Sequence, residues 1–136
     1  MWGIFLLISL LLGAYFFLII EQETRRKKTK EKFINAPLPS YVIEDLCSRN
    51  LVPRYISECT EGTEIARKDI LTIFQSQIPS HTTYSEVTQM FGKYEQYCVE
   101  HTEILHCSYQ LGTPPQVIIE YDAKSETVVA IRSVYE

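Results

Sequence analysis

A long uncharged stretch at the start of the chain limits its fold more than any other feature. Residues 2–20 contain no Asp, Glu, Lys, Arg or His. As an α-helix they would extend about 28 Å, close to the roughly 30 Å hydrocarbon core of a bilayer. The sequence therefore predicts a transmembrane helix over residues 1–24, with the lipid bilayer as the partner of residues 2–20.

Two other interpretations of this stretch have less support. The buried helix of a soluble domain is seldom so uniformly apolar. A cleaved signal peptide begins with basic residues and ends its apolar core at a site with small residues. Here nothing basic precedes the apolar stretch, and bulky Tyr15 and Phe16 follow Ala14 where a lipoprotein would need a cysteine. We therefore expect an uncleaved, single-pass anchor.

A basic run follows the apolar stretch. Lys and Arg beside a span favour its cytoplasmic side, and each also attracts anionic headgroups by about 1 kcal/mol. A solvated extension of the membrane helix would explain the same run. Pro37 and Pro39 then break helical structure, so residues 25–40 are expected to form a basic juxtamembrane segment and a short tether. The basic residues are Arg25, Arg26, Lys27, Lys28, Lys30 and Lys32.

The remainder of the chain is acidic. Residues 33–136 carry seven Lys and Arg against fourteen Asp and Glu, a net charge of −7. A domain with this charge repels phosphate backbones, which argues against nucleic acid as a partner. About 100 residues suffice for a single modest core. We expect one small domain over residues 41–136.

The cysteines give a second indication of compartment. An even number of cysteines in a small domain beyond a membrane anchor is typical of two disulfides. The sequential pairing Cys47–Cys59 and Cys98–Cys107 is one of three connectivities, and loops of this size would contribute about 2–4 kcal/mol. Four thiols in a reducing cytoplasm fit the sequence equally well. The basic run favours a cytoplasmic domain and the cysteine count an extracytoplasmic one, so the sequence leaves the side of the membrane open.

One short helix has both of its ends encoded in the sequence. Thr83 is the expected N-cap, and Glu86 three residues later completes a capping box. Gly92 is expected to end the helix in the left-handed conformation. Between these signals the apolar positions share one helical face; they are Tyr84, Val87 and Phe91.

Apolar spacing predicts the other elements of the domain. One helix is expected to begin at Ser40 and end by Asn50, and another lies within residues 63–78. Beyond Gly92 the spacing changes to the alternation typical of strands. This order predicts an α+β fold, with two or three short helices packed on a three- to four-stranded antiparallel β-meander. The expected strands are residues 94–101, 104–111, 117–121 and 127–134.

Part of this pattern resembles a known family. Residues 70–133 are similar to the small BamE/SmpA-type envelope domains, in which a capped helix is followed by an aromatic hairpin and a strand ending in Tyr-Asp. The resemblance implies two helices on a three-stranded antiparallel sheet, a role as an accessory scaffold, and no catalytic residues. It is carried by Thr83, Glu86, Val87, Phe91, Gly92, Tyr109, Ile119, Tyr121, Asp122, Val129 and Ile131.

Four residues near the first hairpin are candidate metal ligands. Cys98, His101, His106 and Cys107 form a Cys-x2-His-x4-His-Cys pattern, and zinc accepts all four types of ligand atom. On a strand, however, neighbouring side chains point to opposite faces, so His106 and Cys107 could not both reach one ion. A Cys–His nucleophilic pair drawn from these residues has no orienting group or oxyanion site.

No other stretch of the sequence indicates a reaction. Glu120 and Asp122 share a strand face, as paired catalytic carboxylates would, but solvated positions beside a turn explain them better. The sequence contains no Gly-rich phosphate loop and no basic aromatic patch. We therefore expect a cofactor-free, non-catalytic binding or scaffold domain that is held at a membrane and contacts a protein partner. The alternative is a thiol- or metal-dependent sensor or small enzyme built on Cys98, His101, His106 and Cys107.

Overall fold

The computed structural model describes residues 2–134, and the chain divides into two compact units, Met1–Asn35 and Ala36–Glu136. The first unit is the helix α1 (Trp2–Asn35), which continues through the apolar stretch and the basic run without a break. α1 is long and apolar enough to cross a membrane, and none of its described residues is buried. These properties are compatible with a single-pass anchor and also with a signal sequence.

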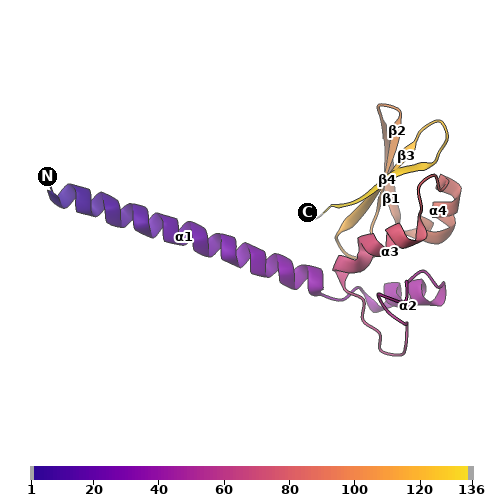
Figure 1. Ribbon diagram of the computed structural model, residues 1–136, viewed down its shortest axis with the longest axis horizontal. Helices are drawn as coiled ribbons and strands as arrows, with labels where there is room; N and C mark the ends of the chain where they lie inside the picture. The colour runs from indigo at the N-terminus through magenta and orange to yellow at the C-terminus, as the bar shows by residue number, and fades with distance from the viewer. Residues whose placement is uncertain (1, 135–136) are drawn as a thin grey trace. The chain divides into compact units, whose positions relative to one another are not determined.

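The second unit contains a four-stranded antiparallel sheet with the strand order β1-β2-β3-β4 (Figure 1). Each strand pairs with the next one along the chain, so the predicted meander is confirmed. The sheet has one strand more than the three-stranded plan that the family resemblance implied. The strands are β1 (Glu95–His101), β2 (Ile104–Tyr109), β3 (Gln116–Asp122) and β4 (Val128–Val134).

Short turns connect the strands. Thr102 and Glu103, between β1 and β2, both have positive φ, 49° and 63°, which is the conformation of a two-residue type I′ hairpin turn. After β3, the carboxylate of Asp122 accepts hydrogen bonds from the backbone N–H groups of Lys124 and Ser125 at 2.9 and 3.0 Å. These local hydrogen bonds explain why polar residues occupy the turns between the strands.

Three α-helices precede the sheet, as the helical spacing predicted. The helix expected within residues 63–78 begins later than predicted, because Ala66 is extended and pairs with Pro37 in an isolated β-bridge. A single 3-10 turn then leads into the α-helix. The elements are α2 (Ser40–Ser48), the 3-10 turn η1 (Arg67–Asp69), α3 (Ile70–Gln77), α4 (Tyr84–Phe91) and the 3-10 turn η2 (Gly92–Tyr94).

The capping box of α4 is confirmed. The backbone N–H of Glu86 donates to the Thr83 hydroxyl at 3.2 Å, and the backbone N–H of Thr83 donates to the Glu86 carboxylate at 3.3 Å. The predicted left-handed stop at Gly92 is wrong, since Gly92 has φ −56° and the chain continues into η2. A Cβ atom at Gly92 would lie 2.9 Å from Cγ2 of Thr88, so a close contact, not a positive φ, favours glycine there.

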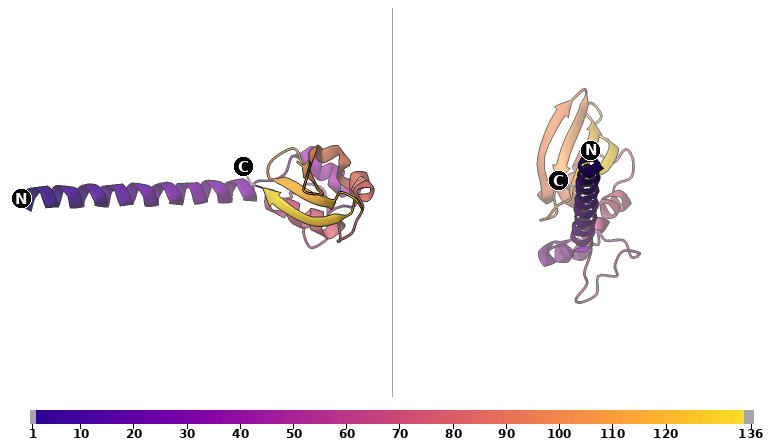
Figure 2. Two further views of the ribbon diagram at one scale, coloured as in Figure 1. Left: turned by 90° about the horizontal axis from the view of Figure 1, so that it is seen from above. Right: turned by 90° about the vertical axis from the view of Figure 1, so that its left-hand side faces the viewer.

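The core lies between one face of the sheet and the helices α3 and α4 (Figure 2), and α2 adds the buried residues Val42, Ile43 and Leu46 to it. The ring of Phe74 on α3 stacks on Phe91 of α4 with 4.1 Å between centroids, and it lies 5.8 Å from the ring of Tyr109 on β2. Along β3, buried residues alternate with half-buried ones, as the period of a strand requires. No described helix of this unit covers the opposite face of the sheet. The fold is therefore a two-layer α+β domain with one open sheet face.

Candidate functional site

The four predicted metal ligands do not come together. Cys98 on β1 lies opposite Cys107 on β2, and their sulfur atoms form a disulfide. His101 and His106 occupy the alternate positions of the same strands, so their side chains point to the open face, away from the two sulfur atoms. The Nδ1 atom of His106 lies 3.3 Å from a carboxylate oxygen of Glu120. The structure therefore does not favour a zinc site built from these four residues.

A different acidic residue lies beside the Cys98–Cys107 disulfide. Glu95 at the start of β1 places one carboxylate oxygen 3.2 Å from the Cys98 sulfur, and the Tyr84 hydroxyl donates to the same oxygen at 2.7 Å. Ligand atoms of Glu95, Cys98 and Cys107 all lie within 4.8 Å of one another. Because the two sulfurs are bonded to each other, neither can act as the thiolate that zinc binds.

The domain thus contains two disulfides. The second joins Cys47 near the end of α2 to Cys59 in the following loop, with 5.6 Å between their Cα atoms. This is the sequential pairing, and the described part of the chain contains no free cysteine. The first disulfide ties the edge strand β1 to β2, and the second fixes the long irregular loop against α2.

Within residues 2–134, the strand β1 forms a free edge of the sheet, because it pairs only with β2. In a two-residue hairpin the residues next to the turn form a hydrogen-bonded pair, and the next pair does not, so the pairs alternate along the strands. By this count Cys98 and Cys107 form a non-hydrogen-bonded pair, which agrees with their Cα separation of 4.1 Å. The backbone N–H and C=O groups of Cys98 and Glu100 therefore point outward from the sheet.

The open face of the sheet combines apolar and charged side chains. Tyr97 and Val99 of β1 are 56% and 55% exposed on this face. Beside them, the carboxylate of Glu120 lies between His106 and Arg132, with 3.5 Å to the Arg132 Nε atom. Glu120 is thus in contact with His106 and Arg132, and among the described residues it does not form an acid–base pair with another carboxylate.

Asp122, the other carboxylate considered from the sequence, has a structural role. Hydrogen bonds from the backbone N–H groups of Ser125 and Lys124 hold the pKa of Asp122 below its usual value. These are the bonds that close the turn between β3 and β4. Asp122 therefore stabilises a turn through its Oδ1 atom, which accepts both backbone hydrogen bonds.

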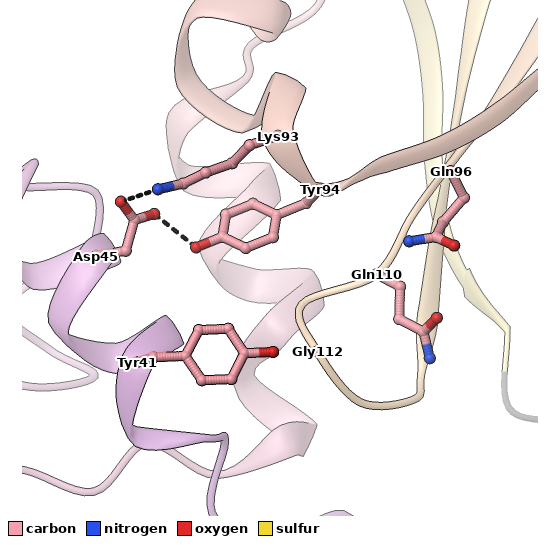
Figure 3. A pocket seen from close by; sticks show the side chains of 7 residues that line it. All are labelled: Tyr41, Asp45, Lys93, Tyr94, Gln96, Gln110 and Gly112. Atoms are coloured by element: carbon pink, nitrogen blue, oxygen red, sulfur yellow. Dashed lines mark hydrogen bonds and ion pairs between the residues drawn. The ribbon is translucent and has the colours of Figure 1, made fainter.

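A polar pocket with a volume of about 400 Å³ lies between α2, η2 and the ends of the first hairpin (Figure 3). Tyr41 and Asp45 of α2 form one side of it, and Lys93 and Tyr94 of η2 form another. Gly112 also lines the pocket and has a positive φ of 73°. A Cβ atom at this position would lie 2.3 Å from the Tyr41 hydroxyl. The remaining lining residues are Gln96 and Gln110.

Asp45 is the centre of the hydrogen bonds around this pocket. The Tyr94 hydroxyl donates to it at 2.5 Å, Arg49 donates through two nitrogens at 2.8 and 3.1 Å, and Lys93 forms an ion pair with it. Burial alone would raise the pKa of Asp45, but the hydrogen bonds from Arg49, Lys93 and Tyr94 outweigh it and lower the pKa to about 2. Burial, followed by the hydrogen bond to Asp45, raises the pKa of Tyr94. Asp45 is therefore charged and Tyr94 is a neutral donor.

Sequence reasoning missed this pocket. Its residues come from α2, η2, β1 and the segment after β2, and no spacing in the sequence links them. The only local signal is Gly112 before Thr113 and two prolines, which predicted a turn but not what packs against it.

The six basic residues predicted to face a membrane surface lie on α1, in its last third, and all six are exposed. Arg25 pairs with Glu21 one turn earlier at 2.9 Å. They continue the apolar helix as a charged, solvated helical segment. No family model matches the chain, and neither a curated protein nor a solved structure matches it.

Proposed function

We propose that this protein is a single-pass membrane protein whose α+β domain binds a protein partner through β1 and the open sheet face, without catalysing a reaction. One observation carries the proposal: β1 combines a free backbone edge with two exposed apolar side chains, Tyr97 and Val99. Soluble domains usually block such an edge or cover it, because it pairs readily with another strand.

The edge is suited to strand addition. An extended segment of a partner would form backbone hydrogen bonds with Cys98 and Glu100, and its alternate side chains would lie over Tyr97 and Val99. The Cys98–Cys107 disulfide holds β1 against β2, so the edge loses little conformational freedom when a partner binds. A disulfide at this position therefore supports binding as well as stability.

Charge indicates the kind of segment that would bind. Residues 94–111 contain three acidic residues, Glu95, Glu100 and Glu103, and no Lys or Arg. An edge of this charge attracts a basic strand and repels an acidic one. We therefore propose an extended partner segment in which apolar residues alternate with Lys or Arg.

We infer that the domain lies outside the cytoplasm. Two disulfides support this side, because disulfides persist in oxidising compartments and are rare in the cytosol. The basic run after the span supports the opposite side. The resemblance to BamE/SmpA-type domains agrees with an envelope location and with a scaffold role, and α1 would hold such a scaffold beside the membrane.

Site-specific photocrosslinking in native membranes tests the proposal. A photoreactive amino acid is placed at Val99 on the open face, and a matched control carries it at exposed Tyr55 in the loop after α2. We expect a discrete crosslinked protein from position 99 and none from position 55. Crosslinking that is equal at both positions, or absent from both, contradicts binding through β1 and the open face.

A further inference from the structure

The polar pocket of Figure 3 is separate from the open sheet face and has a chemistry of its own. We propose that it binds a carboxylate that is bonded to an amide-bearing carbon, as at the C-terminus of a polypeptide or in a small N-acylated amino acid. The inference rests on the charges and unpaired polar groups that line the pocket, and it does not depend on the partner proposed for β1.

The charges around Asp45, at the side of the pocket, leave a local excess of one positive charge once Arg49 is counted, which binds Asp45 but does not line the pocket. Among the described residues that line the pocket, Asp45 is the only acidic one, and both of its oxygens are occupied by Arg49, Lys93 and Tyr94. Arg49 and Lys93 supply two cations against this one carboxylate. The excess stands out because residues 33–136 as a whole are acidic. An anion small enough to enter is therefore favoured here by local charge.

The ammonium group of Lys93 can donate a hydrogen bond to a ligand while it remains paired with Asp45. Its ammonium group carries three donors, and its side chain is 54% exposed. An exposed ion pair of this kind is weak, so sharing the ammonium between Asp45 and a second carboxylate costs little. Asp45 keeps its bonds to Arg49 and Tyr94 in that case.

Three neutral side chains complete the site. Among the described residues, the Tyr41 hydroxyl and the carboxamides of Gln96 and Gln110 make no side-chain hydrogen bond, and all three line the pocket. A carboxamide offers both a donor and an acceptor, which matches the C=O and N–H of a peptide group. The volume of about 400 Å³ lies within the range of small-ligand sites. These groups favour a carboxylate followed by an amide over a simple inorganic anion.

NMR titration of the full chain in nanodiscs tests this assignment through the side-chain amide signals of Gln96 and Gln110. The probes are N-acetyl-alanine, an N-acetylated alanine tetrapeptide with a free C-terminus, and the same tetrapeptide as its C-terminal amide. We expect both free acids to shift the two glutamine signals with dissociation constants on the order of 1 mM, and the amide to bind at least about tenfold more weakly. A tetrapeptide that binds more tightly than N-acetyl-alanine identifies a polypeptide end as the ligand, and equal affinities identify a small acid.

Substitutions separate the pocket from nonspecific attraction. Lys93→Gln should weaken the free acids about tenfold, because it removes the charged donor, and Tyr41→Phe should weaken them less. Lys124→Gln, in the exposed turn after β3, removes the same charge elsewhere and should leave the affinity unchanged. Equal binding of the acid and the amide overturns the proposal, as does an equal effect of Lys93→Gln and Lys124→Gln. The absence of any shift at about 10 mM free acid also overturns it.

Discussion

The phenolic oxygens of Tyr109 and Tyr121 lie 2.8 Å apart in the core of the sheet domain. The two residues belong to neighbouring strands, β2 and β3, and neither side chain is exposed. Burial raises the pKa of both phenols. Each hydroxyl is therefore a neutral group that depends on the other for a hydrogen bond inside the core.

The first prediction concerns this pair. Tyr121→Phe leaves the Tyr109 hydroxyl buried without its partner, which should lower the free energy of unfolding by about 1–3 kcal/mol. Replacing both tyrosines by Phe should cost less than the sum of the two single changes, since no unpaired hydroxyl remains. Urea unfolding of the unchanged protein, the two single variants and the double variant in detergent, followed by near-UV circular dichroism, measures this. Strict additivity would contradict a mutual hydrogen bond.

The second prediction concerns the pH dependence contributed by Asp45. The pKa of Asp45 is lowered to about 2 in the folded domain from 3.8, so its contribution is present above the unfolded value and is lost as the pH falls toward 2. Asp45→Asn should lower the free energy of unfolding by about 1–2 kcal/mol at neutral pH and by almost nothing near pH 2. Urea unfolding at several pH values between 2 and 7 measures the difference.

Glu58→Gln serves as the control for Asp45→Asn, because Glu58 is exposed and removal of its charge leaves the pocket unchanged. The free energy of unfolding of this variant should equal that of the unchanged protein at each pH. A stability loss in Asp45→Asn that stays constant down to pH 2 would show that the carboxylate does not gain its stability from being ionised.

The third prediction compares two glycines. Gly62 and Gly112 have similar positive φ values, 77° and 73°, but only Gly112 has a neighbour in the way of a Cβ atom, the Tyr41 hydroxyl. Gly62→Ala should therefore cost about 1 kcal/mol from backbone conformation alone. Gly112→Ala should cost more, by up to about 1 kcal/mol, because the Tyr41 ring, which is 63% exposed, has to move aside. Equal losses in thermal or urea unfolding would mean that Tyr41 moves aside freely.

These elements differ in how far the sequence could predict them. The helix α4 was predictable because Thr83 and Glu86 bond to each other's backbone within a single turn, so the signal is local. The alternation in β3 likewise needs only its own seven residues. Gly92 was misread because a glycine before a change of direction usually has positive φ, whereas here it makes room for Thr88.

The pocket could not be predicted in the same way. Asp45 meets Tyr94 and Lys93 only because α2 folds back against the end of α4, and these contacts join residues almost fifty positions apart. The separation of Cys107 from His106 did follow from the period of two, once this segment was taken as a strand. Local signals therefore gave the elements, and tertiary packing decided which polar side chains meet.

The fourth prediction concerns the side of the membrane on which the domain lies. If both disulfides form outside the cytoplasm, a membrane-impermeant maleimide should label the accessible cysteines, Cys98, Cys47 and Cys59, in intact cells only after treatment with a reductant. When Cys98 and Cys107 are both replaced by Ser, Cys47 and Cys59 should still be labelled after reduction. This variant is a control for access of the reagent to the domain. Labelling that requires cell lysis and no reductant would place the domain in the cytosol.

The fifth and most direct test addresses the anchor itself. Residues 2–20 should hold the native chain in lipid, so membranes washed with alkaline carbonate should retain it in the pellet, and mass spectrometry should detect residues 2–20 in the retained protein. Release of the protein into the supernatant would contradict the account. So would an intact mass showing that the mature chain begins after Ile20, because α1 would then be a cleaved signal sequence.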